Sequence, residues 1–288
     1  MADHLVRLLT VDGTLRAAAA DTTLLVEEMH RRQGTDPTAT VALGRLMSGA
    51  ALLGSLLKGD QRLALMVEGN GPLGKLHAET DAAGHLRGSL KVPVCGLSPK
   101  DGRFDVAGAV GRAGFLHVVK DLGLKEPYRG LVQLQSSEIA EDIAYYLTTS
   151  EQVPSTVALG VRLAADGSVA AAGGFLIQTL PGAGEAPLIE LERRLAAAPA
   201  VTTMLASGES PSAILHRLFE GFELTAPQTT PLEFRCGCSR PQVLRMLATL
   251  GAAELEELSK RPEGVEVTCE FCKERYRFSP EDVAALGS

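Results

Sequence analysis

Four of the five cysteines form two short pairs near the end of the chain. One glycine separates Cys236 from Cys238, and after thirty further residues Cys269 and Cys272 follow with two residues between them. Zinc prefers four tetrahedral ligands at structural sites, and each close pair brings two sulfurs to the ion. Clustered cysteines in a reducing compartment indicate metal ligands before they indicate disulfides. The spacing therefore predicts one Zn²⁺ per chain, bound by Cys236, Cys238, Cys269 and Cys272.

Spacing alone leaves two uses open for this zinc. A structural ion is the commoner use of four cysteines, and a filled coordination sphere disfavours metal-assisted hydrolysis. The other use is a redox switch, because a Cys-x-Cys disulfide closes a small ring and should be readily reversible. Basic neighbours of the thiols, Arg235, Arg240, Lys273 and Arg275, favour the thiolate that oxidants attack, whereas Glu270 and Glu274 oppose it.

The segment that carries the cysteines is too small to build a large core, so it should depend on its metal. Zinc binding at such sites contributes on the order of 10–16 kcal/mol, and that free energy is folding free energy. Oxidation of the thiols would remove it. The tail should then unfold, and a neighbouring segment that rests on it should loosen.

The whole-chain composition limits the function classes. The 288 residues carry a net charge of -7, only 4% are aromatic and tryptophan is absent, which disfavours nucleic acid as a partner. The first residues do not form a signal peptide and the most apolar stretch is too short for a confident span, so a soluble cytoplasmic protein without a membrane partner is expected. Because neither Gly-x-Ser-x-Gly nor a phosphate loop occurs, no enzymatic activity is expected.

Hydrophobic periodicity places the elements that must position the cysteines. Strand patterns joined by turn residues predict antiparallel hairpins and a meander over 5–9, 15–19, 63–67, 75–80, 85–91, 156–163 and 169–178. Helical patterns predict a helix at 22–32 and another at 37–57, capped by Asp36 and ended by Lys58-Gly59. A further helix is expected after Ser137, which should cap it. Since strands and helices are mixed without regular crossovers, the fold class is α+β.

Three regions are expected along the chain: an α+β core domain at 1–182, a helical linker at 183–230 and a zinc-binding redox-switch domain at 231–288. Strand patterns stop after residue 182, and short helices follow at 187–198 and after Ser210-Pro211. The stretch 225–231, with two prolines, indicates a linker. In the tail, Ser239 should cap a helix, and Val265 with Val267 suggests a strand. The fifth cysteine, Cys95, is interpreted as buried packing.

The sequence also resembles the heat shock protein 33 family of redox-regulated 33-kDa chaperones. The likeness includes the two cysteine pairs and three stretches of the first domain, at 137–147, 150–154 and 173–181. In that family the reduced, zinc-loaded protein is inactive, and peroxide or hypochlorous acid oxidises the cysteines and releases zinc. The resemblance implies disulfides Cys236–Cys238 and Cys269–Cys272, unfolding of the tail and linker, and an active form that holds unfolding proteins without ATP and tends to dimerise.

The linker helices have enough apolar surface to bind clients once they are undocked, and too little length to persist alone. The candidate client-binding residues are Leu188, Leu191, Leu195, Ile214, Leu215, Leu218 and Phe219. Two rivals stay open at the level of sequence. One is a zinc ribbon that binds nucleic acid or a ribosomal partner. The other is a thiol-disulfide oxidoreductase, for which the tail offers no thioredoxin-like unit.

Overall fold

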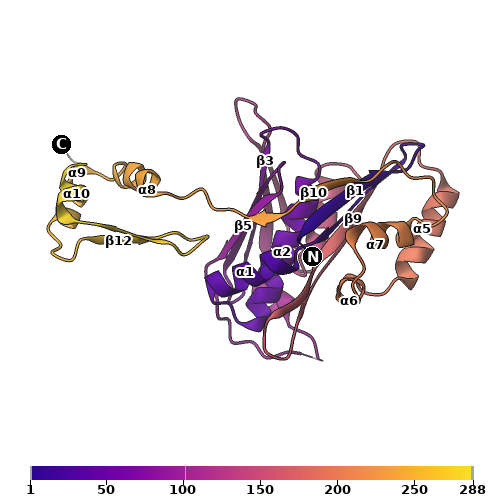
Figure 1. The fold of residues 1–288 in the computed structure, drawn as a ribbon, viewed down its shortest axis with the longest axis horizontal. Helices are drawn as coiled ribbons and strands as arrows, with labels where there is room; N and C mark the ends of the chain where they lie inside the picture. Colours follow the sequence, from indigo (N-terminus) through magenta and orange to yellow (C-terminus); the bar gives the residue numbers. More distant parts are fainter. Residues whose placement is uncertain (1, 101, 287–288) are drawn as a thin grey trace. The chain divides into compact units, whose positions relative to one another are not determined.

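The computed structural model describes residues 2–100 and 102–286 and separates into two units, Met1–Phe234 and Arg235–Ser288. The first unit contains two sheets with helices against them (Figure 1), and the second has a short hairpin with three helices. Mixed helices and predominantly antiparallel sheets confirm the predicted α+β class.

The first sheet has five antiparallel strands in the order β10-β1-β2-β9-β8. Four of them confirm the two predicted hairpins: β1 (His4–Leu9), β2 (Leu15–Asp21), β8 (Ser155–Leu163) and β9 (Val169–Thr179). The fifth, β10 (Gln228–Pro231), lies where the prolines indicated a strandless linker, so that interpretation was wrong. Because β10 is an edge strand, Pro231 is tolerated there opposite His4.

The second sheet has the order β11-β5-β4-β3-β6-β7. The predicted meander is confirmed in β3 (Arg62–Gly69), β4 (Lys75–Asp81) and β5 (His85–Leu90). Two strands that the periodicity did not single out, β6 (Gly114–Asp121) and β7 (Tyr128–Gln133), extend it. On the other edge, the two-residue strand β11 (Glu233–Phe234) pairs in parallel with β5, just before the cysteine tail begins.

Helix α2 (Pro37–Gly54) forms the centre of the main core, where it packs with residues from both sheets. Helix α1 (Thr23–Gln33) precedes it, and the short α3 (Val106–Val110) contacts it. The Asp36 carboxylate accepts a hydrogen bond from the Ala39 N–H at 2.8 Å, as its predicted role as cap requires. The helix ends at Gly54 rather than at Lys58-Gly59. The N–H groups of Leu56 and Leu57 bond to the carbonyls three residues earlier instead of four, and Arg7 donates to the Ser55 carbonyl at 2.8 Å.

Helix α4 (Ala140–Thr149) begins three residues after Ser137, which was predicted to cap it. Ser137 has a positive φ of 63° and donates its hydroxyl to the Gly111 carbonyl, so it does not cap the helix. Instead the buried Asp142 carboxylate accepts hydrogen bonds from the Gln135 N–H at 2.7 Å and the Ile139 N–H at 3.0 Å, and also from the intervening N–H groups of Ser136 and Ser137.

Substitution of Asp142 by alanine is expected to lower the free energy of unfolding by about 3 kcal/mol, because four backbone donors of a buried turn lose their acceptor. The exposed neighbour Glu141 provides the matched control, and Glu141→Ala should change stability by less than about 0.5 kcal/mol. Urea unfolding of both variants measures the difference. Equal losses would show that the carboxylate is not what holds the turn.

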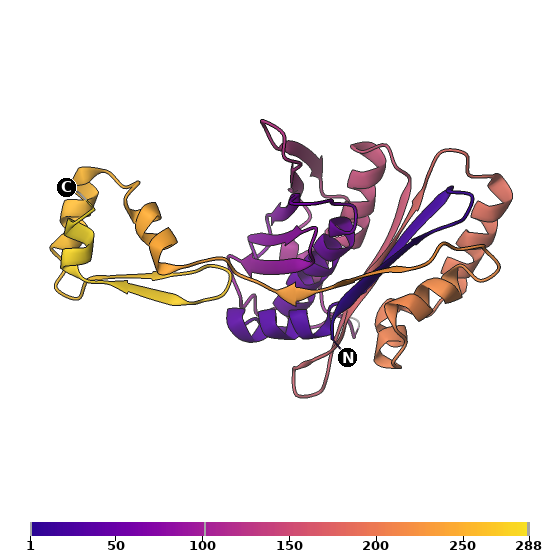
Figure 2. The same ribbon diagram turned by 45° about the horizontal axis from the view of Figure 1, so that its top comes forward.

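The segment predicted as a helical linker covers the face of the first sheet that is turned away from α2 (Figure 2). It contains α5 (Glu185–Ala197), α6 (Val201–Ala206) and α7 (Pro211–Leu218), of which α6 was not predicted. Ser210 caps α7 through the Ala213 N–H at 3.2 Å, as expected. These helices and the sheet share a second core, to which β1, β2 and β9 contribute Leu8, Leu15, Phe175 and Ile177.

The second unit is small. It contains helices α8 (Arg240–Leu247), α9 (Ala252–Ser259) and α10 (Pro280–Ala284), and the hairpin β12 (Val265–Thr268) with β13 (Arg275–Phe278). The predicted strand and helix are confirmed, but the Ser239 side chain makes no capping hydrogen bond. Among the described residues its core has five buried hydrophobic members: Val243, Leu247, Leu255, Phe278 and Val283.

Candidate metal centre

The second unit brings the sulfurs of Cys236, Cys238, Cys269 and Cys272 within 4.8 Å of one another. The first pair precedes α8, and the second pair lies in the turn between β12 and β13. That turn is closed by hydrogen bonds from the Cys269 N–H to the Glu274 carbonyl at 2.9 Å and from the Lys273 N–H to the Cys269 carbonyl at 3.0 Å. Lys273, with φ 60°, makes the left-handed step that the turn needs.

The four sulfurs lie close enough together to share one metal ion, and one of the two separations agrees with a tetrahedral site. Cys236 Sγ lies 3.7 Å from Cys269 Sγ, and Cys238 Sγ lies 3.2 Å from Cys272 Sγ. Four sulfurs at roughly 2.3 Å from one ion would be about 3.8 Å apart at the edges of a tetrahedron. All four cysteines are half-buried, so the cluster is shielded without being closed to small molecules.

Electrostatics shows why the cluster needs a cation. Burial pushes the pKa of Cys236 upward, but hydrogen bonds from the Cys238 backbone and from the three other thiols outweigh it and hold the pKa at about 7. Burial raises the pKa of Cys238, and burial together with the neighbouring sulfurs raises that of Cys272. Four thiolates cannot share so small a volume unless a cation compensates their charge. The donor set therefore fits a thiophilic metal ion, with all four thiols deprotonated when it is bound.

Tyr276 on β13 is a neighbour of the cluster that the spacing of the cysteines did not indicate. Its hydroxyl donates a hydrogen bond to Cys238 Sγ at 3.2 Å, and its ring packs against the small core of this unit. The sequence signal lay in the strand pattern, since residues 275–278 alternate opposite β12. A hydrogen bond to a ligand sulfur fixes its orientation and tunes its electron density.

Substitution of Tyr276 by phenylalanine is expected to weaken metal binding by roughly 10–100-fold, the usual effect of removing a partner of a ligand. Competition with a chromogenic chelator measures the affinity. Tyr145→Phe is the control, because Tyr145 is exposed on α4 in the other unit. If both variants hold the metal as tightly as the unsubstituted protein does, the hydroxyl does not support the ligand.

Two of the basic residues expected to favour thiolates are committed to other partners. Arg240 pairs with Asp282 at 2.6 Å and lies over the Phe278 ring at 4.4 Å from its centroid. Arg275 lies 3.9 Å from a carboxylate oxygen of Glu266. Neither arginine is among the main causes that shift the pKa of Cys236, which are burial and hydrogen bonds from Cys238, Cys269 and Cys272.

The fifth cysteine lies apart, in the first unit. Cys95 is half-buried rather than buried as expected, because its loop is tied to Asp36: the Cys95 N–H donates to the carboxylate at 2.7 Å, and the thiol lies 3.6 Å from it. Burial raises the pKa of this thiol, and the Asp36 charge raises it further. Cys95 is therefore not a reactive thiolate.

The seven residues predicted to contact clients come together in the second core. Leu191, Ile214, Leu215, Leu218 and Phe219 are buried there, and Leu188 and Leu195 are partly buried against them. In this form of the protein, these side chains pack against the first sheet and are not free to bind a partner.

Comparison with known proteins places the whole chain beside one family. The family model described as Hsp33 protein matches residues 3–279. A 33 kDa chaperonin of Syntrophotalea carbinolica is 64% identical over 99% of both chains, and one of Geobacter sulfurreducens is 50% identical over 99% of this chain and 94% of its own. The crystal structure of a 33 kDa chaperonin from Thermotoga maritima superposes with a TM-score of 0.91 at 36% identity, covering 98% of this chain and 97% of that one. Within residues 2–100 and 102–286, none of the helices is long and apolar enough to cross a membrane.

Proposed function

Since this chain belongs to the Hsp33 family of chaperones, we propose that it is an ATP-independent holdase of the cytoplasm, activated by oxidation of a zinc centre. Family membership makes it a chaperone that binds client proteins. The observation that supports the redox mechanism is the cluster of four sulfurs within 4.8 Å, placed in a unit whose described core has five buried side chains. A metal ion at this cluster contributes more to folding than so small a core can.

The proposed switch is a two-electron oxidation of each cysteine pair. One peroxide oxidises two thiolates to one disulfide and is reduced to two waters after taking up protons, so two peroxides oxidise the centre and release one Zn²⁺. We propose the pairs Cys236–Cys238 and Cys269–Cys272. The two sulfur–sulfur distances given above each join one pair to the other, so a peptide map of the oxidised protein is the decisive test of the pairing.

Loss of the zinc would unfold the second unit and then release the helical linker at 183–230. The linker and the second unit are connected through two short strands. The linker runs into β10, β11 follows β10, and β11 ends two residues before Cys236. The helices α5 to α7 are 13, 6 and 8 residues long, too short to persist without the sheet. Their release would expose the second core to clients and favour a homodimer.

We expect peroxide to convert the protein from inactive to active in suppressing the aggregation of a heat-unfolding client, followed by light scattering. One zinc should be released as four thiols disappear, and dithiothreitol with zinc should reverse both changes. A fully oxidised protein that suppresses aggregation no better than the reduced one would contradict the proposal. Zinc release without thiol loss would contradict the chemistry alone.

A further inference from the structure

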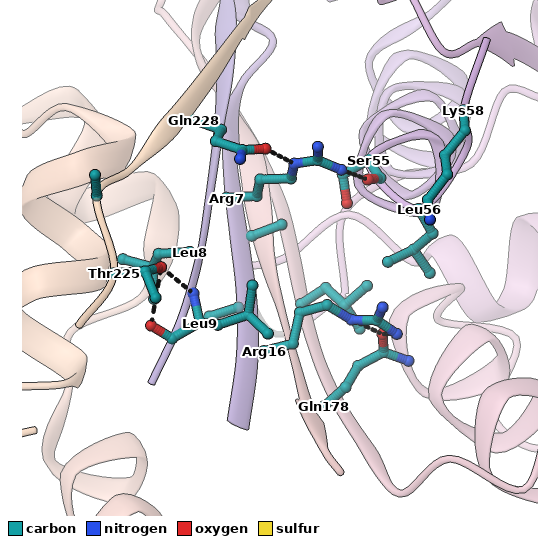
Figure 3. A pocket seen from close by; sticks show the side chains of 14 residues that line it. Arg7, Leu8, Leu9, Arg16, Ser55, Leu56, Lys58, Gln178, Thr225 and Gln228 are labelled. Atoms are coloured by element: carbon teal, nitrogen blue, oxygen red, sulfur yellow. Dashed lines mark hydrogen bonds between the residues drawn. The ribbon is translucent and has the colours of Figure 1, made fainter. Parts of the chain in front are cut away.

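A cavity of about 240 Å³ opens on the first sheet beyond the end of α2 (Figure 3). Here the sheet face that elsewhere carries the main core presents two arginines. Strand register pairs Arg7 with Gln228 on β10, and Arg16 with Gln178 on β9. Arg7 and Arg16 are diagonal neighbours across β1 and β2, and the Cα atoms of such neighbours are roughly 7–8 Å apart. Lys58 lines the same cavity from the loop after α2.

The acceptors of both guanidinium groups are neutral. Arg7 donates from Nε to the Gln228 side-chain oxygen at 2.7 Å and from Nη1 to the Ser55 carbonyl. Arg16 donates from Nε and Nη2 to the Gln178 side-chain oxygen at 3.1 and 2.7 Å. None of the residues that line the cavity is acidic, and within the described part of the chain neither arginine forms an ion pair.

The carboxylate whose charge acts on Arg16 is that of Glu151, and one of its oxygens already has two partners. Glu151 accepts hydrogen bonds from the Tyr146 hydroxyl at 2.6 Å and from Lys120. Burial lowers the pKa of Arg16, the charge of Glu151 raises it, and the charge of Arg7 lowers it by a smaller amount. Because an arginine nevertheless stays protonated, both positive charges remain at the lining of this half-buried cavity. A bound anion would relieve their repulsion.

The geometry of the free donors selects the kind of anion. Each guanidinium has five N–H groups and uses two, so three remain on each arginine. Such paired forks match the oxygens of phosphate. We propose that this cavity binds a phosphate group, as free phosphate or as a small phosphomonoester, between Arg7 and Arg16 with Lys58 at its rim.

Phosphate binding would also affect activation, because part of the cavity wall belongs to the helical linker. This effect on activation rests on the proposed function, whereas phosphate binding itself does not. Thr225, Ala226 and Gln228 line the cavity, and they belong to the segment whose release is proposed to accompany activation. A ligand that binds only while this wall is in place favours the closed state by a factor of about 1 + [L]/Kd, or about 100-fold at a hundredfold excess over Kd. Phosphate would therefore raise the threshold for activation.

Titration of the reduced, zinc-loaded full chain with inorganic phosphate at constant ionic strength, followed by calorimetry and ³¹P NMR, tests the site. We expect one saturable site, weakened at least tenfold in Arg7→Gln and in Arg16→Gln. Arg162→Gln makes the same charge change at an exposed position of β8 and should leave binding intact. Glycerol 3-phosphate forms a second arm, since tighter binding than phosphate identifies a phosphomonoester and weaker binding identifies free phosphate.

A second pair of variants leaves both arginines in place. Ala226 is exposed at the cavity wall, so Ala226→Glu supplies a competing carboxylate, while Ala226→Gln supplies the same shape without charge. Loss of phosphate binding in the first variant alone supports the site. Absence of saturable binding by the unsubstituted protein, or equal binding by these two variants, overturns it.

Proteolysis of residues 183–230 during peroxide treatment, with and without phosphate, tests the coupling. Slower cleavage with phosphate, lost in Arg16→Gln, is expected. Unchanged cleavage at saturating phosphate would refute the coupling and leave the binding result standing, whereas failure of peroxide to activate the protein without phosphate would refute the proposed function instead.

Discussion

Replacement of Cys238 by serine is expected to abolish zinc binding and unfold residues 235–288 while residues 1–234 stay folded. Removing one of four thiolates forfeits most of the roughly 10–16 kcal/mol that the metal contributes. The five side chains buried among the described residues of this unit cannot replace it, since fully burying one such side chain contributes about 1.5–3 kcal/mol before chain entropy is subtracted. The resonances of residues 235–288 should collapse to random-coil positions in a ¹H–¹⁵N spectrum.

Cys95→Ser is the matched control, because this thiol lies in the other unit, tied to Asp36. It should retain one zinc and a native spectrum. If Cys238→Ser keeps both its zinc and its folded tail, the four-cysteine centre does not hold this unit together, and the proposed switch loses its driving force. Chelation of zinc from the unsubstituted protein should reproduce the Cys238→Ser spectrum.

The sequence predicted those features that depend on local patterns. The strand patterns at 5–19 and 156–178 predicted two hairpins, and the cysteine spacing predicted a cluster that the structure brings together. Features that depend on distant pairing could not be predicted. The edge strand β10 exists because β1, more than two hundred residues earlier, offers it a partner. Asp142 stabilises a turn through backbone N–H groups, which leave no mark in residue type.

The same limit applied to the cavity that carries Arg7 and Arg16. Nothing in the spacing of these residues brings two guanidinium groups together until the register of β1, β2 and β9 is known. Tyr276 was missed for a related reason, because a tyrosine on a short strand is ordinary until its hydroxyl is found at Cys238 Sγ. The sequence predicted the four cysteines of the proposed metal centre, but only the fold showed what surrounds them.

Leu215→Ala is expected to undock the helical segment and make the reduced protein active without any oxidant. Leu215 is 0% exposed in the core that joins α7 to β1 and β2. Truncation of a buried leucine costs about 3 kcal/mol, a large share of the docking free energy of helices this short. Hydrogen exchange at residues 185–218 should accelerate, and client aggregation should be suppressed under reducing conditions with zinc still bound.

Ile189→Ala is the control for this prediction, because Ile189 is 58% exposed on α5 and its loss should cost less than about 0.5 kcal/mol. It should leave exchange and activity unchanged. If the Leu215 variant undocks by hydrogen exchange but remains inactive, release of this segment is not the activating step, whatever the zinc centre does.

The Leu215 variant also separates two surfaces that could hold the client. Undocking exposes the helices, with Leu191 and Phe219, and equally the sheet face beneath them, with Leu8, Phe175 and Ile177. The sequence indicated only the helices, because the sheet face is assembled from strands far apart in the chain. Combining Leu215→Ala with Phe219→Ala should weaken client binding if the helices bind the client. It should preserve client binding, or improve it, if the sheet face does, since the helices then only cover the surface.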